Sequence, residues 1–172
     1  MTDFSETHIT NPRPRVALIG VTGYGWMHFD EIRKRVERGH GTFAGATVIN
    51  PGDAPEQMDW FRQHEVPVFG DYTAMLERLD GALDLCCIPT AISMHRPMVE
   101  AALRVGANVL VEKPLAGCPA DARAIVEAGD AAEIEDRRNE ALPAGDPANP
   151  VMTLPGIDEP IHARADQFLA RP

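Results

Sequence analysis

The sequence predicts an α/β fold in which helices cover both faces of a doubly wound parallel sheet of about five strands. Short apolar runs alternate with longer amphipathic segments between residues 15 and 129, a pattern that is typical of parallel sheets. The first apolar run leads through a glycine-rich turn directly into a helical pattern. With 172 residues, 44% of them hydrophobic, the chain has the length and apolar content of one domain.

The first strand and the first helix are the clearest elements. Residues 15–20 form a short apolar run after Pro12 and Pro14, which favours a strand buried on both faces. A turn with the sequence Gly-Val-Thr-Gly-Tyr-Gly occupies residues 20–25. Residues 26–36 then have helical periodicity.

The later elements continue the alternation. Strands are predicted at residues 46–49, 66–69, 82–88 and 107–111, and helices at 56–64, 72–79, 93–105 and 119–128. Asp53 and Glu56 have the spacing of a capping box, which gives Asp53 a structural role. Pro67 indicates an edge strand. Gly106 and Gly129 are predicted to end the last two helices.

The chain divides into three parts by composition. Residues 1–13 form an N-terminal extension, and residues 14–132 form the α/β domain. Residues 133–172 contain six prolines and little apolar periodicity, so we expect a mostly irregular tail in which only residues 161–169 have a helical pattern.

Charge and cysteine content exclude several classes of protein. A formal net charge of −10 argues against nucleic acid or an anionic membrane as a partner. No apolar run approaches the roughly 20 residues of a membrane span, and the N-terminus lacks the pattern of a secretory signal. Cys86 and Cys87 are adjacent in a strand and face opposite ways, so they do not form a metal site, and no other metal site is predicted. We expect a reduced, cytoplasmic protein.

The glycine-rich turn has the context of a dinucleotide-binding loop of the Rossmann type, because it joins a strand to a helix. Gly20 makes the tight turn and Gly25 allows the helix to pack closely on the strand. Backbone N–H groups of Gly23, Tyr24 and Gly25 are expected to point toward a pyrophosphate. Thr22 departs from the usual pattern, in which glycine occupies the middle position.

Lys113 is a candidate for proton transfer. The chain has only two lysines, Lys34 and Lys113, and its other basic side chains, histidines aside, are arginines. Lys113 follows the apolar run 107–111, at the carboxyl end of a predicted strand, where ligands of parallel sheets bind. A lysine gives or takes a proton far more readily than an arginine does.

Three motifs together resemble the N-terminal part of the Gfo/Idh/MocA oxidoreductases. They are the turn at residues 20–25, the segment Ile-Pro-Thr-Ala-Ile-Ser-Met-His at 88–95, and Val-Glu-Lys-Pro at 111–114. The resemblance covers residues 14–129. It implies that Thr90 and His95 border a nicotinamide cofactor, that Glu112 holds its ribose and that Lys113 faces the reacting carbon.

The same resemblance implies hydride transfer to or from a sugar, a polyol or a related hydroxyl compound. His28 is assigned to packing or to the surface.

Asn50 stands where an acidic residue usually binds the ribose hydroxyls of NAD. It does not repel a 2′-phosphate, but no arginine follows immediately and Asp53 is near, so NAD is favoured while NADP is not excluded.

Three interpretations remain open. Family members continue into a substrate domain that does not fit in residues 133–172, so we expect a truncated, internally deleted or split oxidoreductase that is inactive alone and is completed by a protein partner or a homo-oligomer. The alternative is a non-catalytic, dinucleotide-binding regulatory module. Another Rossmann-type enzyme fits less well, because neither Tyr24 nor Tyr72 has a lysine four residues on, as a short-chain dehydrogenase needs, and a methyltransferase does not explain residues 112–114.

Overall fold

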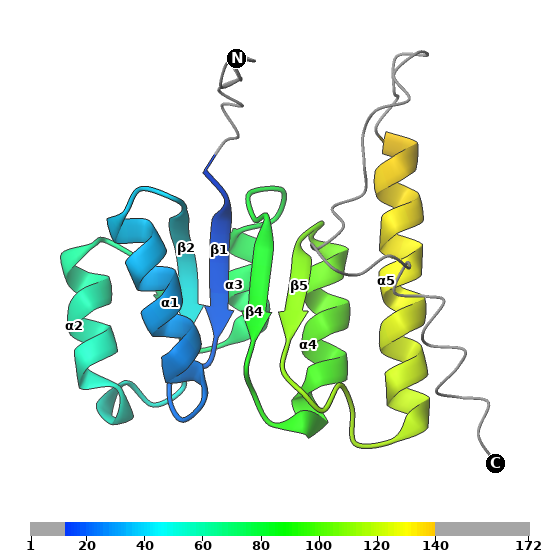
Figure 1. Ribbon diagram of the computed structural model, residues 1–172, viewed down its shortest axis with the longest axis horizontal. Coiled ribbons are helices and arrows are strands. Elements are labelled where there is room, and N and C mark those ends of the chain that lie inside the picture. Colours follow the sequence, from blue (N-terminus) through cyan, green and yellow to red (C-terminus); the bar gives the residue numbers. More distant parts are fainter. Residues whose placement is uncertain (1–12, 140–172) are drawn as a thin grey trace, which may run out of the picture. The chain divides into compact units, whose positions relative to one another are not determined.

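The computed structural model describes residues 13–139. Its strands are β1 (Arg15–Ile19), β2 (Thr42–Thr47), β3 (Val68–Phe69), β4 (Leu85–Ile88) and β5 (Asn108–Val111). Its helices are α1 (Gly25–Glu37), the short 3-10 helix η1 (Pro51–Asp53), α2 (Pro55–Gln63), α3 (Tyr72–Arg78), α4 (Ile92–Arg104) and α5 (Pro119–Asn139). All adjacent strands pair in parallel, in the order β3-β2-β1-β4-β5 (Figure 1). The predicted fold class is therefore confirmed.

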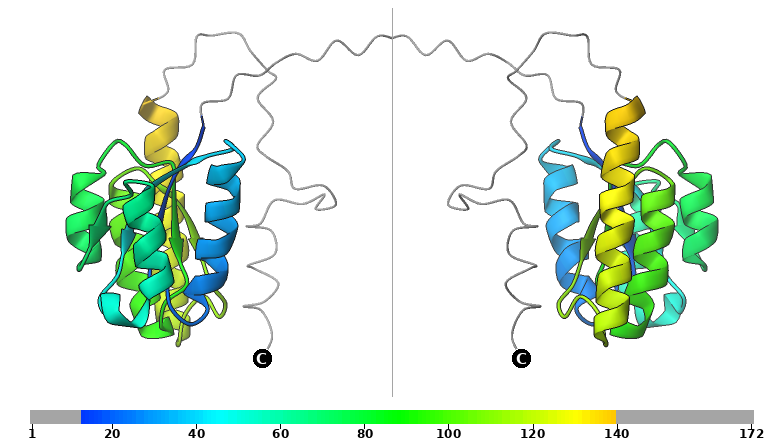
Figure 2. Two further views of the ribbon diagram at one scale, coloured as in Figure 1. Left: turned by 90° about the vertical axis from the view of Figure 1, so that its left-hand side faces the viewer. Right: turned by 90° about the vertical axis from the view of Figure 1, so that its right-hand side faces the viewer.

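Helices cover both faces of the sheet, with α1 and α2 on one face and α3, α4 and α5 on the other (Figure 2). Neighbouring strand residues alternate between the two cores. Ala17 packs with the α3–α4 side, whereas Leu18 packs with the α1–α2 side. Cys86 and Cys87 divide in the same way, so the two adjacent thiols do face opposite ways, as the strand geometry predicted.

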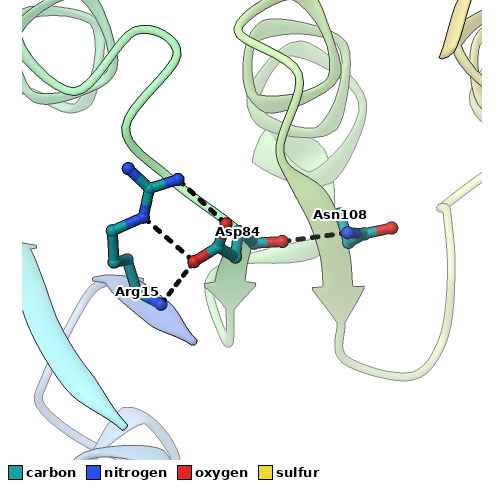
Figure 3. A network of polar contacts seen from close by, with 3 residues as sticks. All are labelled: Arg15, Asp84 and Asn108. Carbon is teal, nitrogen blue, oxygen red and sulfur yellow. Dashed lines mark hydrogen bonds and ion pairs between the residues drawn. The ribbon is translucent and has the colours of Figure 1, made fainter. Parts of the chain in front are cut away.

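A polar network joins three strands at the amino edge of the sheet (Figure 3). The carboxylate of Asp84 accepts hydrogen bonds from the backbone N–H and the Nε of Arg15, at 2.7 and 3.0 Å, and its other oxygen lies 2.9 Å from Arg15 Nη2. The carbonyl oxygen of Asp84 accepts from the side-chain Nδ2 of Asn108 at 3.0 Å. These contacts hold the start of β1 beside the segments that lead into β4 and β5.

Three local predictions were wrong. Strand β2 begins at Thr42, before the predicted start, since the small residues Ala44 and Gly45 hide its apolar signal and Gly45 packs under Leu79 and Phe69. The capping box at Asp53 does not form, because Ala54 is the N-cap of α2 and no side chain caps it.

The third error concerns the end of the last helix. Helix α5 continues through Gly129 to Asn139, and so includes residues 133–139 of the predicted tail. A glycine inside a helix costs only about 1 kcal/mol relative to alanine, and alanines at 128, 131 and 132 offset that cost. Residues 1–12 of the predicted extension and residues 140–172 of the predicted tail lie outside the described residues.

The edge position of β3 is confirmed. Pro67 comes directly before this strand, and its carbonyl oxygen accepts a hydrogen bond from Ala46 N–H at 3.1 Å. Between residues 13 and 139, none of the helices has both the length and the apolar character needed to cross a membrane.

Candidate functional site

The glycine-rich turn is closed on itself between β1 and α1. Gly20 and Gly23 have positive φ angles of +89° and +57°, in the region that side chains with a Cβ rarely adopt. The N–H of Gly25 donates to Thr22 O at 2.9 Å. A Cβ atom at Gly25 would lie only 2.4 Å from the carbonyl oxygen of Gly20. This close approach explains why the first turn of α1 needs glycine.

Two hydrogen bonds fix the turn to the rest of the domain. The N–H of Gly20 donates to Thr47 O, at the end of β2, at 3.1 Å. The buried side chain of Gln57 on α2 donates through Nε2 to Val21 O at 3.2 Å. Gln57 was missed from the sequence, where a single polar residue in an amphipathic helix gives no signal of its partner.

A cavity of about 240 Å³ opens at the carboxyl ends of the central strands. Four residues predicted for the cofactor line it: Gly20, Thr22, Asn50 and Thr90. Asp53, Asp71 and Tyr72 line it as well, and none of them was among the residues predicted to bind the cofactor. The floor is formed by apolar side chains, among them Ile19, Val48 and Met98.

The carboxylate of Asp71 is the N-cap of helix α3. It caps α3 by accepting hydrogen bonds from Thr73 N–H at 2.9 Å and Ala74 N–H at 3.0 Å, and from the Thr73 hydroxyl. The Thr73 hydroxyl bond and the Ala74 bond lower the pKa of Asp71 below its ordinary value. Asp71 thus places a fixed negative charge at the rim of the cavity.

Thr90 and His95 belong to one hydrogen-bonded unit. His95 is buried on α4, with Nε2 at 3.0 Å from Thr90 O and Nδ1 at 3.1 Å from Leu115 O. The Thr90 hydroxyl donates to Met98 Sδ at 3.4 Å. His95 does not line the cavity, and its ring joins the loop that follows β4 to the loop that follows β5.

Glu112 pairs with His28, a residue that the sequence assigned to packing or to the surface. His28 Nε2 lies 2.9 Å from Glu112 Oε1, and the Lys113 N–H donates to Glu112 Oε2 at 3.3 Å. The His28 contact is the main cause of the lowered pKa of Glu112, and the Lys113 N–H lowers it further. Helix α1 and the segment after β5 are therefore joined where the sequence predicted the catalytic group.

Lys113 and Tyr24 are exposed beside this pair. Within residues 13–132, whose side chains the structure describes, no hydrogen bond or ion pair engages the Lys113 ammonium group. The Tyr24 ring meets the His28 ring edge to face, with centroids 5.9 Å apart. Apart from Gly23, Gly25 and His95, the predicted residues thus fall into two groups, one around the cavity and one around Glu112.

The thiols of the two adjacent cysteines, Cys86 and Cys87, are buried and unreactive. Burial raises the pKa of Cys86 to about 12 and that of Cys87 to about 11. Both thiols stay protonated at neutral pH, so neither acts as a nucleophile. In the part of the chain that the structure describes, no cluster of three histidine, cysteine or acidic side chains has the arrangement of a metal site.

A curated relative and several solved structures are similar to this chain. A dTDP-3,4-didehydro-2,6-dideoxy-α-D-glucose 3-reductase from Streptomyces violaceoruber is 43% identical over 56 residues, which cover 33% of this chain and 16% of the reductase. The WlbA dehydrogenase from Chromobacterium violaceum, solved in complex with NADH and UDP-GlcNAcA, matches with a TM-score of 0.61 and 24% identity, over 73% of this chain and 34% of that one.

A myo-inositol 2-dehydrogenase from Lactobacillus plantarum matches with a TM-score of 0.56 and 22% identity, over 69% of this chain and 33% of that one. At these identities, the solved structures show the fold. The chain spans about a third of the length of each of the two dehydrogenases.

The family comparison is more specific. The model of the Gfo/Idh/MocA family, described as an oxidoreductase family with an NAD-binding Rossmann fold, matches residues 15–134. That range includes the glycine-rich turn, the cavity and the Glu112–Lys113 segment. The chain therefore belongs to the Gfo/Idh/MocA oxidoreductase family and contains its NAD-binding Rossmann domain.

Proposed function

We propose that this domain binds NAD along the carboxyl edge of the sheet and serves an oxidoreductase that acts on a sugar, a polyol or a related hydroxyl compound. The observation that carries the proposal is the cavity, because its wall is continuous with the glycine-rich turn through Gly20, Val21 and Thr22. Adenosine and pyrophosphate are joined in NAD, so their sites must adjoin as these two features do.

The residues of the turn fit a pyrophosphate. A Cβ at Gly23 would meet no protein atom within 4 Å, so this side of the turn is open to a ligand. Of the N–H groups expected to bind the phosphates, that of Gly25 donates to Thr22 O, whereas those of Gly23 and Tyr24 donate no hydrogen bond within residues 13–132. Together with the positive end of the helix dipole, they favour an anionic group at this position.

The second group of residues is proposed to serve the reacting end. NAD, when bound, supplies the acceptor or donor of the hydride. We assign Glu112 to the ribose nearest the nicotinamide, with His28 holding its carboxylate in place. Lys113 carries an exposed ammonium group, which exchanges a proton with the substrate oxygen. Thr90 borders the cofactor, and His95 positions Thr90 through its carbonyl group.

The substrate class and the partner are part of this proposal. The similar proteins include a dTDP-sugar reductase and an inositol dehydrogenase, which supports a hydroxyl-rich substrate. Because the chain spans about a third of the dehydrogenases, we propose that further protein, either a partner or a second copy, completes the substrate site. We place this activity in the cytoplasm, in keeping with three free cysteines. The match to an oxidoreductase family favours this function over a purely regulatory module.

Calorimetric titration with NADH tests the proposal. Wild-type protein should bind NADH saturably with a micromolar dissociation constant. Gly23→Val should weaken binding tenfold or more, since the side chain would fill the open side of the turn. Gly81→Val is the matched control, because Gly81 also has a positive φ angle of +64° and open space around it, but lies outside the glycine-rich turn.

Both variants carry a similar backbone strain, so their losses of stability should be similar. Only Gly23→Val should lose affinity for NADH. Wild-type protein that does not bind NADH, or equal affinity in the two variants, would contradict the proposed site.

A further inference from the structure

Asn50, three positions after the end of β2, does not explain how this site would distinguish NAD from NADP, which differ by a phosphate on the adenosine ribose. An acidic residue at this position accepts hydrogen bonds from the ribose hydroxyls and repels the 2′-phosphate. Here the position is held by Asn50, whose amide both donates and accepts and carries no charge. Discrimination against the phosphate must therefore come from another group.

Asp53 lies on the wall of the same cavity as Asn50. It is the last residue of η1, and its N–H donates to Asn50 O at 3.0 Å, so the two residues belong to one short turn. The sequence pattern predicted that Asp53 forms a capping box, but the N-cap of α2 is Ala54, and no side chain caps this helix. The carboxylate of Asp53 therefore does not cap α2, although its spacing from Glu56 predicted that it would.

The charge of the cavity wall is negative. Asp53 is exposed, and no hydrogen bond or ion pair with the side chains and backbone described for residues 13–132 engages its carboxylate. Asp71 lines the cavity too, but its carboxylate oxygen Oδ1 serves the N-cap of α3. Among the described side chains of residues 13–132, no arginine or lysine lines the cavity, whereas a 2′-phosphate is usually held by an arginine.

We propose that Asp53, rather than Asn50, determines the preference of this site for NAD. Its free carboxylate accepts hydrogen bonds from the ribose hydroxyls and repels the doubly charged phosphate of NADP. This assignment rests on the proposed function, because it requires that the cavity receive the adenosine half of the cofactor.

The test compares the dissociation constants of NADH and NADPH in three proteins by calorimetry. Asp53→Asn should reduce the preference for NADH tenfold or more, chiefly by strengthening NADPH binding. Glu56→Gln is the matched control. It also removes one negative charge, only three residues from Asp53, but the Glu56 side chain does not line the cavity. It should change the preference less than twofold, and thermal melting should show that both variants are folded.

The outcomes separate this inference from the proposed function. Wild-type protein that binds neither nucleotide overturns both. Wild-type protein that binds both nucleotides equally refutes the role of Asp53 and leaves the cofactor site in place. An equal change of preference in Asp53→Asn and Glu56→Gln would mean that net charge, not the position of Asp53, sets the preference.

Discussion

His28 Nε2 lies 2.9 Å from Glu112 Oε1, although the two residues are 84 positions apart in the chain. The pair connects the first turns of α1, where the glycine-rich turn ends, with the segment that carries Lys113. A shift of either segment would break the contact. The geometry of the glycine-rich turn is therefore linked to that of the segment that carries Lys113.

Removal of His28 should change the titration of Glu112. In His28→Ala the main hydrogen bond that lowers the pKa of Glu112 is lost, so its carboxyl group should titrate at a higher pH than in the wild type. Carbon-13 NMR of the glutamate carboxyl groups measures this directly. The exposed His40 offers a control, and His40→Ala should leave the Glu112 titration where it was. An unchanged Glu112 in His28→Ala would show that the pairing does not persist in solution.

Replacement of Lys113 should abolish hydride transfer and change the affinity for NADH only slightly. Its ammonium group is exposed and does not line the cavity, so Lys113→Ala should keep the dissociation constant of NADH within about threefold of the wild-type value. In any preparation that turns over a substrate, the same variant should lose hydride transfer. A large loss of NADH binding, measured by calorimetry, would instead assign Lys113 to the cofactor.

Gly25 should tolerate no side chain. In Gly25→Ala the new Cβ would lie 2.4 Å from the oxygen and 2.9 Å from the carbonyl carbon of Gly20, and these are backbone atoms that cannot turn aside. We expect a loss of about 1–3 kcal/mol in the free energy of unfolding, the range for overpacked sites. Gly52→Ala meets no atom within 4 Å and should stay within about 0.5 kcal/mol of the wild type. Urea unfolding of both variants checks the difference.

Acid should weaken the contact between Arg15 and Asp84. The hydrogen bonds from the Arg15 side chain and backbone lower the pKa of Asp84 in the folded protein. The ionised carboxylate therefore adds stability above the unfolded value of about 3.9, and this contribution is lost as the pH falls through the folded value. Both groups are more than a third exposed, so at neutral pH Asp84→Asn should cost only about 0.5–1 kcal/mol.

Urea unfolding between pH 2 and 7 measures this difference for the wild type and Asp84→Asn. The two curves should converge at the acid end. Asp59→Asn, which removes another exposed carboxylate from an ion pair, serves as the comparison. Curves that stay parallel down to the lowest pH would show that the Asp84 carboxylate does not contribute through its charge.

The fold was predictable because its strands are apolar on both faces. The run at β1 and the adjacent cysteines of β4 have so few polar side chains that only a sheet covered on both sides accommodates them. The limits of β2 and α5 were not predictable from the same pattern. Packing against Phe69 and Leu79 decides that Gly45 belongs to a strand, and local sequence does not contain that information.

The site was predictable where the backbone conformation itself demands a residue type. Gly20 and Gly23 adopt positive φ angles, and the close contact at Gly25 excludes a side chain, so these positions stand out in the sequence. His28 and Gln57 did not stand out, because their partners, Glu112 and Val21, lie far away along the chain. For Asp53, a local spacing rule indicated a cap that the folded chain does not form.

The contacts among Arg15, Asp84 and Asn108 lie at the edge of the sheet opposite the cavity (Figure 3). The register of the three strands is thus held by residues that do not line the cavity. Turns at the cavity edge are consequently open to redesign or evolutionary drift, since a changed ligand preference need not disturb the strand alignment. A tethering point for a sensor surface would likewise be best placed beside Asn108, where attachment leaves the cavity accessible.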